Sequence, residues 1–249
     1  IMPSLVGSEM CIRDSNNKFR LDVWGAITLG TIALYALFLL YPMAYLIRQS
    51  VLDPDTGSFT LAYFTKFFSK SYYFDTLINS FKVSITATVL SIAIGTPLAY
   101  LFTIFKIKGK SVLNILIVVA SMSAPFIGAY SWILLLGRSG IITTFFKNLG
   151  IAIPDIYGFG GIVLVMTLQL FPLVFLYAKG ALKNIDNSLI EAAENLGCSG
   201  IACFFKVAVP LIMPTLLAAA LLVFMRSFAD FGTPMLIGEG YRTFPVVLY

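Results

Sequence analysis

The chain has 249 residues, of which 59% are hydrophobic and only 12% are charged. Soluble domains carry roughly 25% charged residues, so this composition excludes a water-soluble globule, and its high hydrophobicity also excludes a disordered chain. The net charge of +5 forms no basic stripe, which excludes nucleic acid as a partner. The lack of histidine removes histidine-dependent catalysis and the commonest zinc ligand. We therefore expect a membrane protein.

Five apolar runs of about the length that crosses a membrane follow one another along the chain. A spanning helix needs about 20 predominantly apolar residues, whereas the strands of a membrane barrel are shorter and alternate in polarity. The second run is expected to begin early, near Leu77, with Lys82 extending towards the membrane interface. The sequence therefore predicts an all-α, polytopic membrane helical bundle, and a sixth span is expected beyond Tyr249. The charge-free runs are Val23–Ile47, Val83–Phe105, Ser111–Gly137, Ile156–Ala178 and Val207–Met225.

The segments around these runs indicate how the chain is organised. Residues 1–15 show no periodicity and resemble a translated cloning adaptor, with a disordered native terminus as the alternative, so they are left out of the fold prediction. Residues 16–76 are expected to hold the first span and an external loop with a turn at Asp53–Gly57. Between the third and fourth runs, a short helix is expected over Ile141–Leu149, where Gly150 stops it.

The fourth and fifth runs are separated by the longest amphipathic stretch of the sequence. Ser188 is followed three residues later by Glu191, a spacing that predicts a capping box at the start of a helix. Gly197 can adopt the left-handed conformation that ends a helix. Ala192 and Ala193 leave one face of that helix open to another surface. The stretch therefore predicts a short helix that docks against a partner.

A second short helix is expected from Ser199 to Lys206, before Pro210 opens the next span. The residues that stand out by their spacing are Glu191, Ala192, Ala193, Gly197, Val207, Val209 and Pro210. This spacing resembles the EAA loop of the binding-protein-dependent ABC importer permeases (type I), whose pattern reads E-A-A-x3-G-x9-I-x-L-P. The sequence departs from that pattern only at Val207 and Val209, both of which are aliphatic.

The resemblance implies a fold, a location and a set of partners. The type I permease fold would cover residues 77–249, truncated before its last span, with residues 179–210 as a cytoplasmic coupling loop of a multi-pass protein in the bacterial inner membrane. That loop would sit in a groove of a dimer of separate ATPase subunits, which bind ATP and Mg. This chain is therefore expected to bind no cofactor or metal and not to be an enzyme. A periplasmic substrate-binding protein, membrane lipid and a second permease half, fused or separate, complete the expected partners.

Three further stretches resemble the ferric-iron branch of these permeases. Members of that branch are usually two six-helix halves fused in one chain, each with its own EAA loop, and this chain resembles the first half. The resemblance implies ferric iron as the substrate, while polyamine, thiamine, sulfate and phosphonate are the alternatives from related branches. The three stretches are Ala124–Trp132, Leu135–Gly140 and Phe228–Pro234.

Two charged residues lie at the end of the fifth run. Arg226 and Asp230 are four residues apart, so on one helix they would pair with each other. An ionisable pair near a span is a functional-site candidate, and the flexible Gly232 and Pro234 beside it indicate an outer gate or pathway. The alternative is a self-neutralising pair with a structural role.

Two other classes of protein share features with the sequence. Gly137–Gly140 matches the G-x-S-G pattern around the serines of intramembrane rhomboid proteases, but without histidine the usual serine–histidine pair cannot form. A membrane scaffold with no transport role would have no ATPase partner. The prediction is therefore the transmembrane subunit of an ATP-driven importer.

Overall fold

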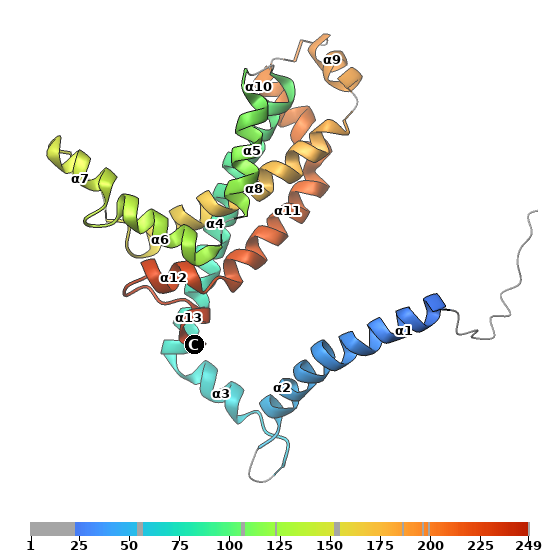
Figure 1. Ribbon diagram of the computed structural model, residues 1–249, viewed down its shortest axis with the longest axis vertical. Coiled ribbons are helices and arrows are strands. Elements are labelled where there is room, and N and C mark those ends of the chain that lie inside the picture. The colour runs from blue at the N-terminus through green and yellow to red at the C-terminus, as the bar shows by residue number, and fades with distance from the viewer. Residues whose placement is uncertain are drawn as a thin grey trace, which may run out of the picture. The chain divides into compact units, whose positions relative to one another are not determined.

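The computed structural model divides into two compact units, residues 1–66 and 67–249, and each is described by itself. The regular secondary structure of the described residues is helical apart from one isolated antiparallel bridge between Leu52 and Phe59, which confirms the predicted all-α class (Figure 1). The leader predicted over residues 1–15 lies outside the described residues. The structure describes residues 23–53, 57–105, 108–122, 124–151, 155–185, 187–195, 197–198 and 200–248.

The first unit is built on one long apolar rod, coloured in blue shades in Figure 1. A π-helical turn lies within the rod and is closed by a hydrogen bond from the Tyr41 N–H to the Ala36 carbonyl. This turn directly precedes Pro42, which has no N–H and whose ring crowds the preceding turn of a helix, so the wider turn relieves the strain. None of the rod's residues is buried. The rod consists of α1 (Val23–Tyr35), η1 (Ala36–Leu40) and α2 (Tyr41–Val51).

A tight turn follows the rod, as predicted from the sequence. The Gly57 N–H donates to the Asp53 carbonyl at 2.8 Å, and the Asp53 N–H donates to the Ser58 carbonyl at 3.0 Å. Gly57 has a φ of +64°, a backbone conformation that favours glycine. The short helix α3 (Ala62–Ser69) comes next, and the boundary between the two units falls within it.

The second unit is organised around α4 (Ser71–Ile104), which makes its most extensive contacts with α8 (Phe159–Lys183) and also packs against α11 (Val209–Ala229). The second span thus begins even earlier than the predicted Leu77. Aromatic side chains join the helices, for example Phe102 of α4 and Phe175 of α8, whose ring centroids are 5.1 Å apart.

A stripe of small residues lets α4 and α8 approach each other closely. The stripe has one buried small residue every four positions, at Ala87, Ser91, Gly95 and Ala99. A Cβ atom at Gly95 would lie only 2.9 Å from the Phe171 carbonyl oxygen. At Gly95 the backbones of the two helices therefore come close to each other, the packing that membrane helices achieve with small residues.

The third predicted span, Ser111–Gly137, is wrong as a single helix. The structure has two helices there, α5 (Lys110–Ser121) and α6 (Pro125–Leu136), which run in different directions in Figure 1. Ala124 is extended, with φ −68° and ψ 143°, because the residue before a proline disfavours the helical conformation. The chain is thus broken inside an apolar run.

The described residues still contain five helices that are long and apolar enough to cross a membrane, the number predicted. Beyond α6, the expected short helix is confirmed as α7 (Ile141–Asn148), and Gly150 follows it with φ +76°. Two short helices, α12 (Gly232–Ile237) and α13 (Phe244–Leu248), follow α11. The five candidate spans are Val23–Val51, Ser71–Ile104, Pro125–Asn148, Phe159–Lys183 and Phe204–Ala229.

The separate helix predicted from Ser199 to Lys206 is also wrong. Helix α10 (Gly200–Cys203) passes through a second π-helical turn, η2 (Phe204–Ala208), directly into α11. The Val209 N–H closes this turn on the Phe204 carbonyl, and Pro210 follows, as Pro42 follows the first π turn. A proline near the start of a helix is accommodated here by widening the turn before it, not by ending the helix.

Candidate functional site

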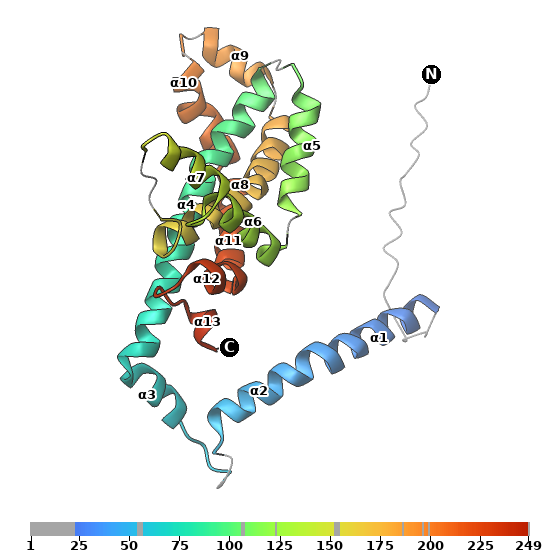
Figure 2. The same cartoon turned by 60° about the vertical axis from the view of Figure 1, so that its left-hand side comes forward.

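The predicted docking helix lies at the end of the second unit where α5 begins and α8 ends, away from α12 and α13 (Figure 2). This helix, α9 (Asn187–Asn195), carries Glu191, Ala192 and Ala193. The Ala192 side chain is exposed and Ala193 is half-buried. That these small side chains leave one face of α9 open to a partner stays a prediction.

Helix α9 begins at Asn187, one residue before Ser188, so the cap at Ser188 stays a prediction. The sequence offers three successive residues of the capping type, Asp186, Asn187 and Ser188, so their pattern does not fix the first residue of the helix. The predicted contact of the Glu191 side chain lies outside the described side chains.

Gly197 follows α9 in the conformation predicted from the sequence. Its φ is +86°, and the Cys198 N–H donates to the Ala193 carbonyl at 3.0 Å. This hydrogen bond, which spans five residues around a left-handed glycine, is that of a Schellman motif. No atom lies within 4 Å of the position where a Cβ would be built on Gly197. Glycine is therefore required here for its backbone conformation and not for lack of space.

The last part of the motif lies where the chain continues from the region of α9 into the fifth span. Val207 lies in η2, and Val209 and Pro210 begin α11. Phe204 anchors the connection to α4, with its ring centroid 4.8 Å from that of Tyr100. Residues 200–229 therefore form one uninterrupted helical run from the docking region to the opposite end of α11.

At that opposite end, the structure forms a pocket of about 420 Å³, which we call the outer pocket. It brings together the ends of α5 and α11, the first turn of α6, the middle of α8 and the start of α12. The break in the third predicted span thus opens towards the charged residues singled out in the sequence. The pocket is lined by Ser121, Pro125, Phe126, Gln169, Leu170, Arg226, Ala229, Asp230, Phe231 and Gly232.

The predicted ion pair between Arg226 and Asp230 does not form. Helix α11 ends at Ala229, and Asp230 is extended (φ −71°, ψ 120°), so the two residues do not share the helical spacing that would bring them together. The ion pairs found among the described residues lie elsewhere. The alternative of a self-neutralising pair is therefore also wrong.

Asp230 instead holds the first turn of α12. Its Oδ1 accepts a hydrogen bond from the Gly232 N–H at 2.9 Å, and its Oδ2 accepts one from the Thr233 hydroxyl at 2.6 Å. Burial raises the pKa of the Asp230 carboxyl, and the hydrogen bonds from Thr233 and Gly232 oppose that rise. Asp230 thus fixes the start of α12 at the rim of the outer pocket.

Gly232 lines the outer pocket beside Asp230, and its role in a gate stays a prediction. It is buried, and a Cβ at this position would lie 3.2 Å from the Phe126 ring. The rings of Phe126 and Phe231 meet edge to face at 6.0 Å, and Pro234 is buried in α12. Two aromatic rings therefore form an apolar wall of the outer pocket, and Gly232 allows one of them to come close.

Sequence reasoning missed a charge cluster near the outer pocket's end of the unit. The Arg138 Nε lies 3.0 Å from Asp155 Oδ2, its Nη2 lies 2.9 Å from Glu239 Oε1, and its guanidinium lies 4.7 Å from the centre of the Tyr157 ring. The two carboxylates are 17 and 101 residues away in sequence. Partners so far apart in the sequence form no local pattern that could predict the cluster. Arg138 itself lies in Leu135–Gly140, one of the stretches that resemble the ferric-iron branch.

Arg138→Met is expected to loosen the two segments that Arg138 holds. Each ion pair is about half exposed and weak on its own, but one guanidinium joins both carboxylates and an aromatic ring. We expect faster amide hydrogen exchange over residues 155–158 and 238–243 of the variant, with unchanged exchange in α4. Arg48→Met in the first unit is the control, and equal exchange in both variants would contradict a joining role for Arg138.

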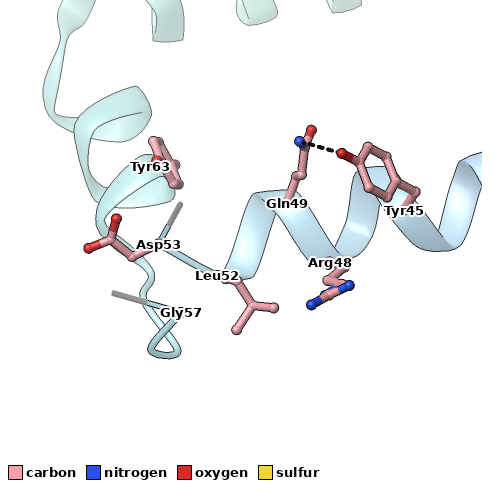
Figure 3. A pocket seen from close by; sticks show the side chains of 7 residues that line it. All are labelled: Tyr45, Arg48, Gln49, Leu52, Asp53, Gly57 and Tyr63. Carbon is pink, nitrogen blue, oxygen red and sulfur yellow. Dashed lines mark hydrogen bonds between the residues drawn. The ribbon is translucent and has the colours of Figure 1, made fainter. Parts of the chain in front are cut away.

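A second pocket lies within the first unit, between the end of α2, the Gly57 turn and α3. It has a volume of about 470 Å³ and is lined by several polar side chains (Figure 3). Arg48 and Gln49 project from opposite sides of α2, and the Gln49 amide donates to the Tyr45 hydroxyl at 3.2 Å. None of the residues predicted from the sequence to couple or to gate lines this pocket.

Residues 58–248 match the family described as the binding-protein-dependent transport system inner membrane component. The chain belongs to this family. Membership confirms the predicted permease class and the predicted location in the inner membrane. It contradicts the two alternatives considered for the sequence, an intramembrane enzyme and a scaffold without a transport role, because the family consists of membrane components of transport systems. The coupling roles of Glu191 and Gly197 stay predictions.

Relatives with two different transport assignments resemble the chain to a similar degree. A putative ferric transport system permease protein, FbpB 1 of Haemophilus influenzae, is 28% identical over 226 residues. The match covers 90% of this chain but 35% of that relative, so the chain spans about a third of its length. The spermidine/putrescine transport system permease protein PotB of the same organism is 29% identical over 232 residues, covering 90% of this chain and 79% of PotB.

A solved structure supports the fold. A chain of the bacterial alginate ABC transporter, crystallised with an alginate-bound periplasmic protein, aligns with a TM-score of 0.71 at 16% sequence identity. The alignment covers 91% of this chain and 82% of that one. This similarity confirms the permease fold that the EAA-like spacing predicts, and it concerns the fold alone.

Proposed function

We propose that this chain is the substrate-translocating permease subunit of an ATP-driven importer that moves ferric iron across the inner membrane. The observation that carries the transport role is the uninterrupted helical run over residues 200–229, which joins the docking region to the outer pocket. The similarity to the ferric relatives supports iron as the substrate.

The proposed partners follow from the two ends of that helical run. A dimer of ATPase subunits, which binds ATP and Mg, would dock on α9, and a substrate-loaded periplasmic binding protein would dock at the outer side. A second permease half, fused or separate, would complete the pathway. The residues proposed to couple to the ATPase are Glu191, Ala192, Ala193, Gly197, Val207, Val209 and Pro210.

The proposed mechanism is alternating access. ATP binding closes the ATPase pair, α9 moves with it, and the continuous helix from Gly200 to Ala229 carries this displacement to the outer pocket. A rigid helix transmits such movement better than a loop would. Substrate must bind the outward and inward states with different affinity, because a ligand that binds both equally shifts no population.

Polyamine transport is the second candidate. It is favoured by PotB, which is as similar as the ferric relatives and of which this chain spans 79%. Uptake by the complete transporter, reconstituted with its ATPase and its binding protein, separates the two. We expect ATP-dependent accumulation of labelled ferric iron and none of labelled putrescine or spermidine. Accumulation of a polyamine without iron would overturn the iron assignment.

A further inference from the structure

We propose that the outer pocket binds an oxyanion group of the transported substrate and that Arg226 is its cationic contact. The proposal rests on the importer function proposed above and adds the chemical class that this site recognises.

The charges in the outer pocket are not equivalent. Both carboxylate oxygens of Asp230 accept hydrogen bonds from the first turn of α12, at 2.9 Å from the Gly232 N–H and 2.6 Å from the Thr233 hydroxyl. The Arg226 guanidinium, by contrast, has no ion-pair partner among the described residues. The pocket therefore presents an engaged anion and an available cation.

The geometry of the Arg226 guanidinium restricts which chemical groups of a ligand could pair with it. Arginine carries five N–H donors on a planar fork, which matches two oxygen atoms of a carboxylate or phosphate. Arg226 is exposed and lies one turn before the end of α11, inside the candidate span Phe204–Ala229, and a charge within a span is costly unless it is paired. A ligand oxyanion would supply the missing partner.

The walls of the outer pocket add a few polar groups to an apolar frame. Gln169 lies ten residues into α8, about 15 Å along its axis, and one amide N–H reaches the Pro125 carbonyl at 3.5 Å, which leaves its other N–H for a ligand. The first turn of α6 opens on the same space with the positive end of its helix dipole. Together with the Phe126 and Phe231 rings, this is the composition typical of small-molecule sites.

This chemistry disfavours two of the substrate forms considered above. A polyamine or a bare ferric ion would be repelled by Arg226, and both oxygens of the negatively charged Asp230 already accept hydrogen bonds from Gly232 and Thr233. An oxyanion fits, either as a ligand bound to ferric iron or as a free substrate such as sulfate or a phosphonate. The two sources share the same contact with Arg226, and experiment can separate them.

Ligand protection of a cysteine in the pocket tests the proposal without relying on transport. Ser121→Cys places a thiol in the pocket lining, and its reaction with a thiol reagent is followed in the complete reconstituted transporter, with the parent chain giving the background of the native cysteines. We expect inorganic phosphate to slow the reaction and putrescine not to slow it. In Ser121→Cys/Arg226→Gln the phosphate concentration needed should rise about 10-fold or more, the scale of a lost charge-assisted hydrogen bond.

Matched variants decide between a pocket contact and a general charge effect. Arg226→Lys keeps the charge but loses the planar fork, so protection should weaken less than in Arg226→Gln. Arg48→Gln removes one arginine from the first unit and should leave protection unchanged. Protection that is absent, that survives Arg226→Gln, or that putrescine matches would overturn the proposal.

Uptake in the same vesicles shows whether the oxyanion is bound to iron or is itself the substrate. It also tests the iron assignment separately from the oxyanion site. Iron uptake that requires added phosphate would identify an oxyanion bound to iron, whereas uptake of labelled phosphate or sulfate alone would identify a free oxyanion. Arg226→Gln should raise the KM of that uptake about 10-fold or more. Phosphate protection without any iron uptake would refute the iron assignment and still support the oxyanion site.

Discussion

A complete transporter carrying Gly197→Val is expected to insert in normal amounts and to lose substrate-stimulated ATP hydrolysis and uptake. The φ of +86° at this position is strongly unfavourable for a β-branched residue, at a local cost of about 1–3 kcal/mol. Relief of that strain would break the hydrogen bond from the Cys198 N–H to the Ala193 carbonyl and turn α9 away from its docking orientation. The packed spans do not involve this residue, so the fold should persist.

Two variants show whether backbone conformation is the cause. Gly197→Asn should retain most coupling, because asparagine visits the left-handed region far more readily than valine, and the open space around Gly197 accommodates its side chain. Gly57→Val introduces the same kind of strain (φ +64°, open space) in the first unit and should leave coupling intact. The measurements are membrane content, ATP hydrolysis and uptake in reconstituted vesicles. Normal transport by Gly197→Val would show that α9 is only a capped surface helix.

Local sequence signals predicted those features that depend on neighbouring residues. Runs of apolar residues sufficed for the number of spans, because a helix in lipid satisfies its own backbone hydrogen bonds. Gly197 and Gly57 could be assigned to turns because a left-handed residue is almost always glycine. The helix α9 could be predicted from the residues between Glu191 and Gly197, because its start and end depend on nearby residues and not on packing against distant segments.

Features that depend on packing between distant segments could not be predicted in the same way. Arg226 and Asp230 fit a helical spacing, but α11 ends at Ala229 and Thr233 takes the carboxylate instead. Pro125 lies inside the third predicted span, Ser111–Gly137, but the helix breaks before it, and this break forms part of the outer pocket. The prolines show why the sequence alone does not decide this. A π-helical turn precedes Pro42 and Pro210, whereas the helix is interrupted before Pro125.

The contact between α4 and α8 predicts the largest effect on stability. Gly95→Leu is expected to leave little folded transporter, because its side chain would start from a Cβ placed 2.9 Å from both the Phe171 carbonyl oxygen and the Val174 Cβ. Overpacking of a core typically costs about 1–3 kcal/mol, and here the obstruction includes backbone, which cannot rotate away. The most extensive helix contact of the unit would have to open.

Gly95→Ala is a stricter test of close packing, because helix propensity alone favours alanine over glycine by about 1 kcal/mol and would stabilise the variant. At Gly30 in α1, where no atom lies within 4 Å of a built Cβ, the same substitution should leave the unfolding midpoint unchanged or raise it. At Gly95 the midpoint should fall despite the better propensity, because α4 and α8 must separate to admit the methyl group. The test is thermal unfolding of the purified transporter in detergent. Equal midpoints for Gly95→Ala and Gly30→Ala would mean that the two helices can separate slightly at no cost, and that the small residues of α4 do not set their distance.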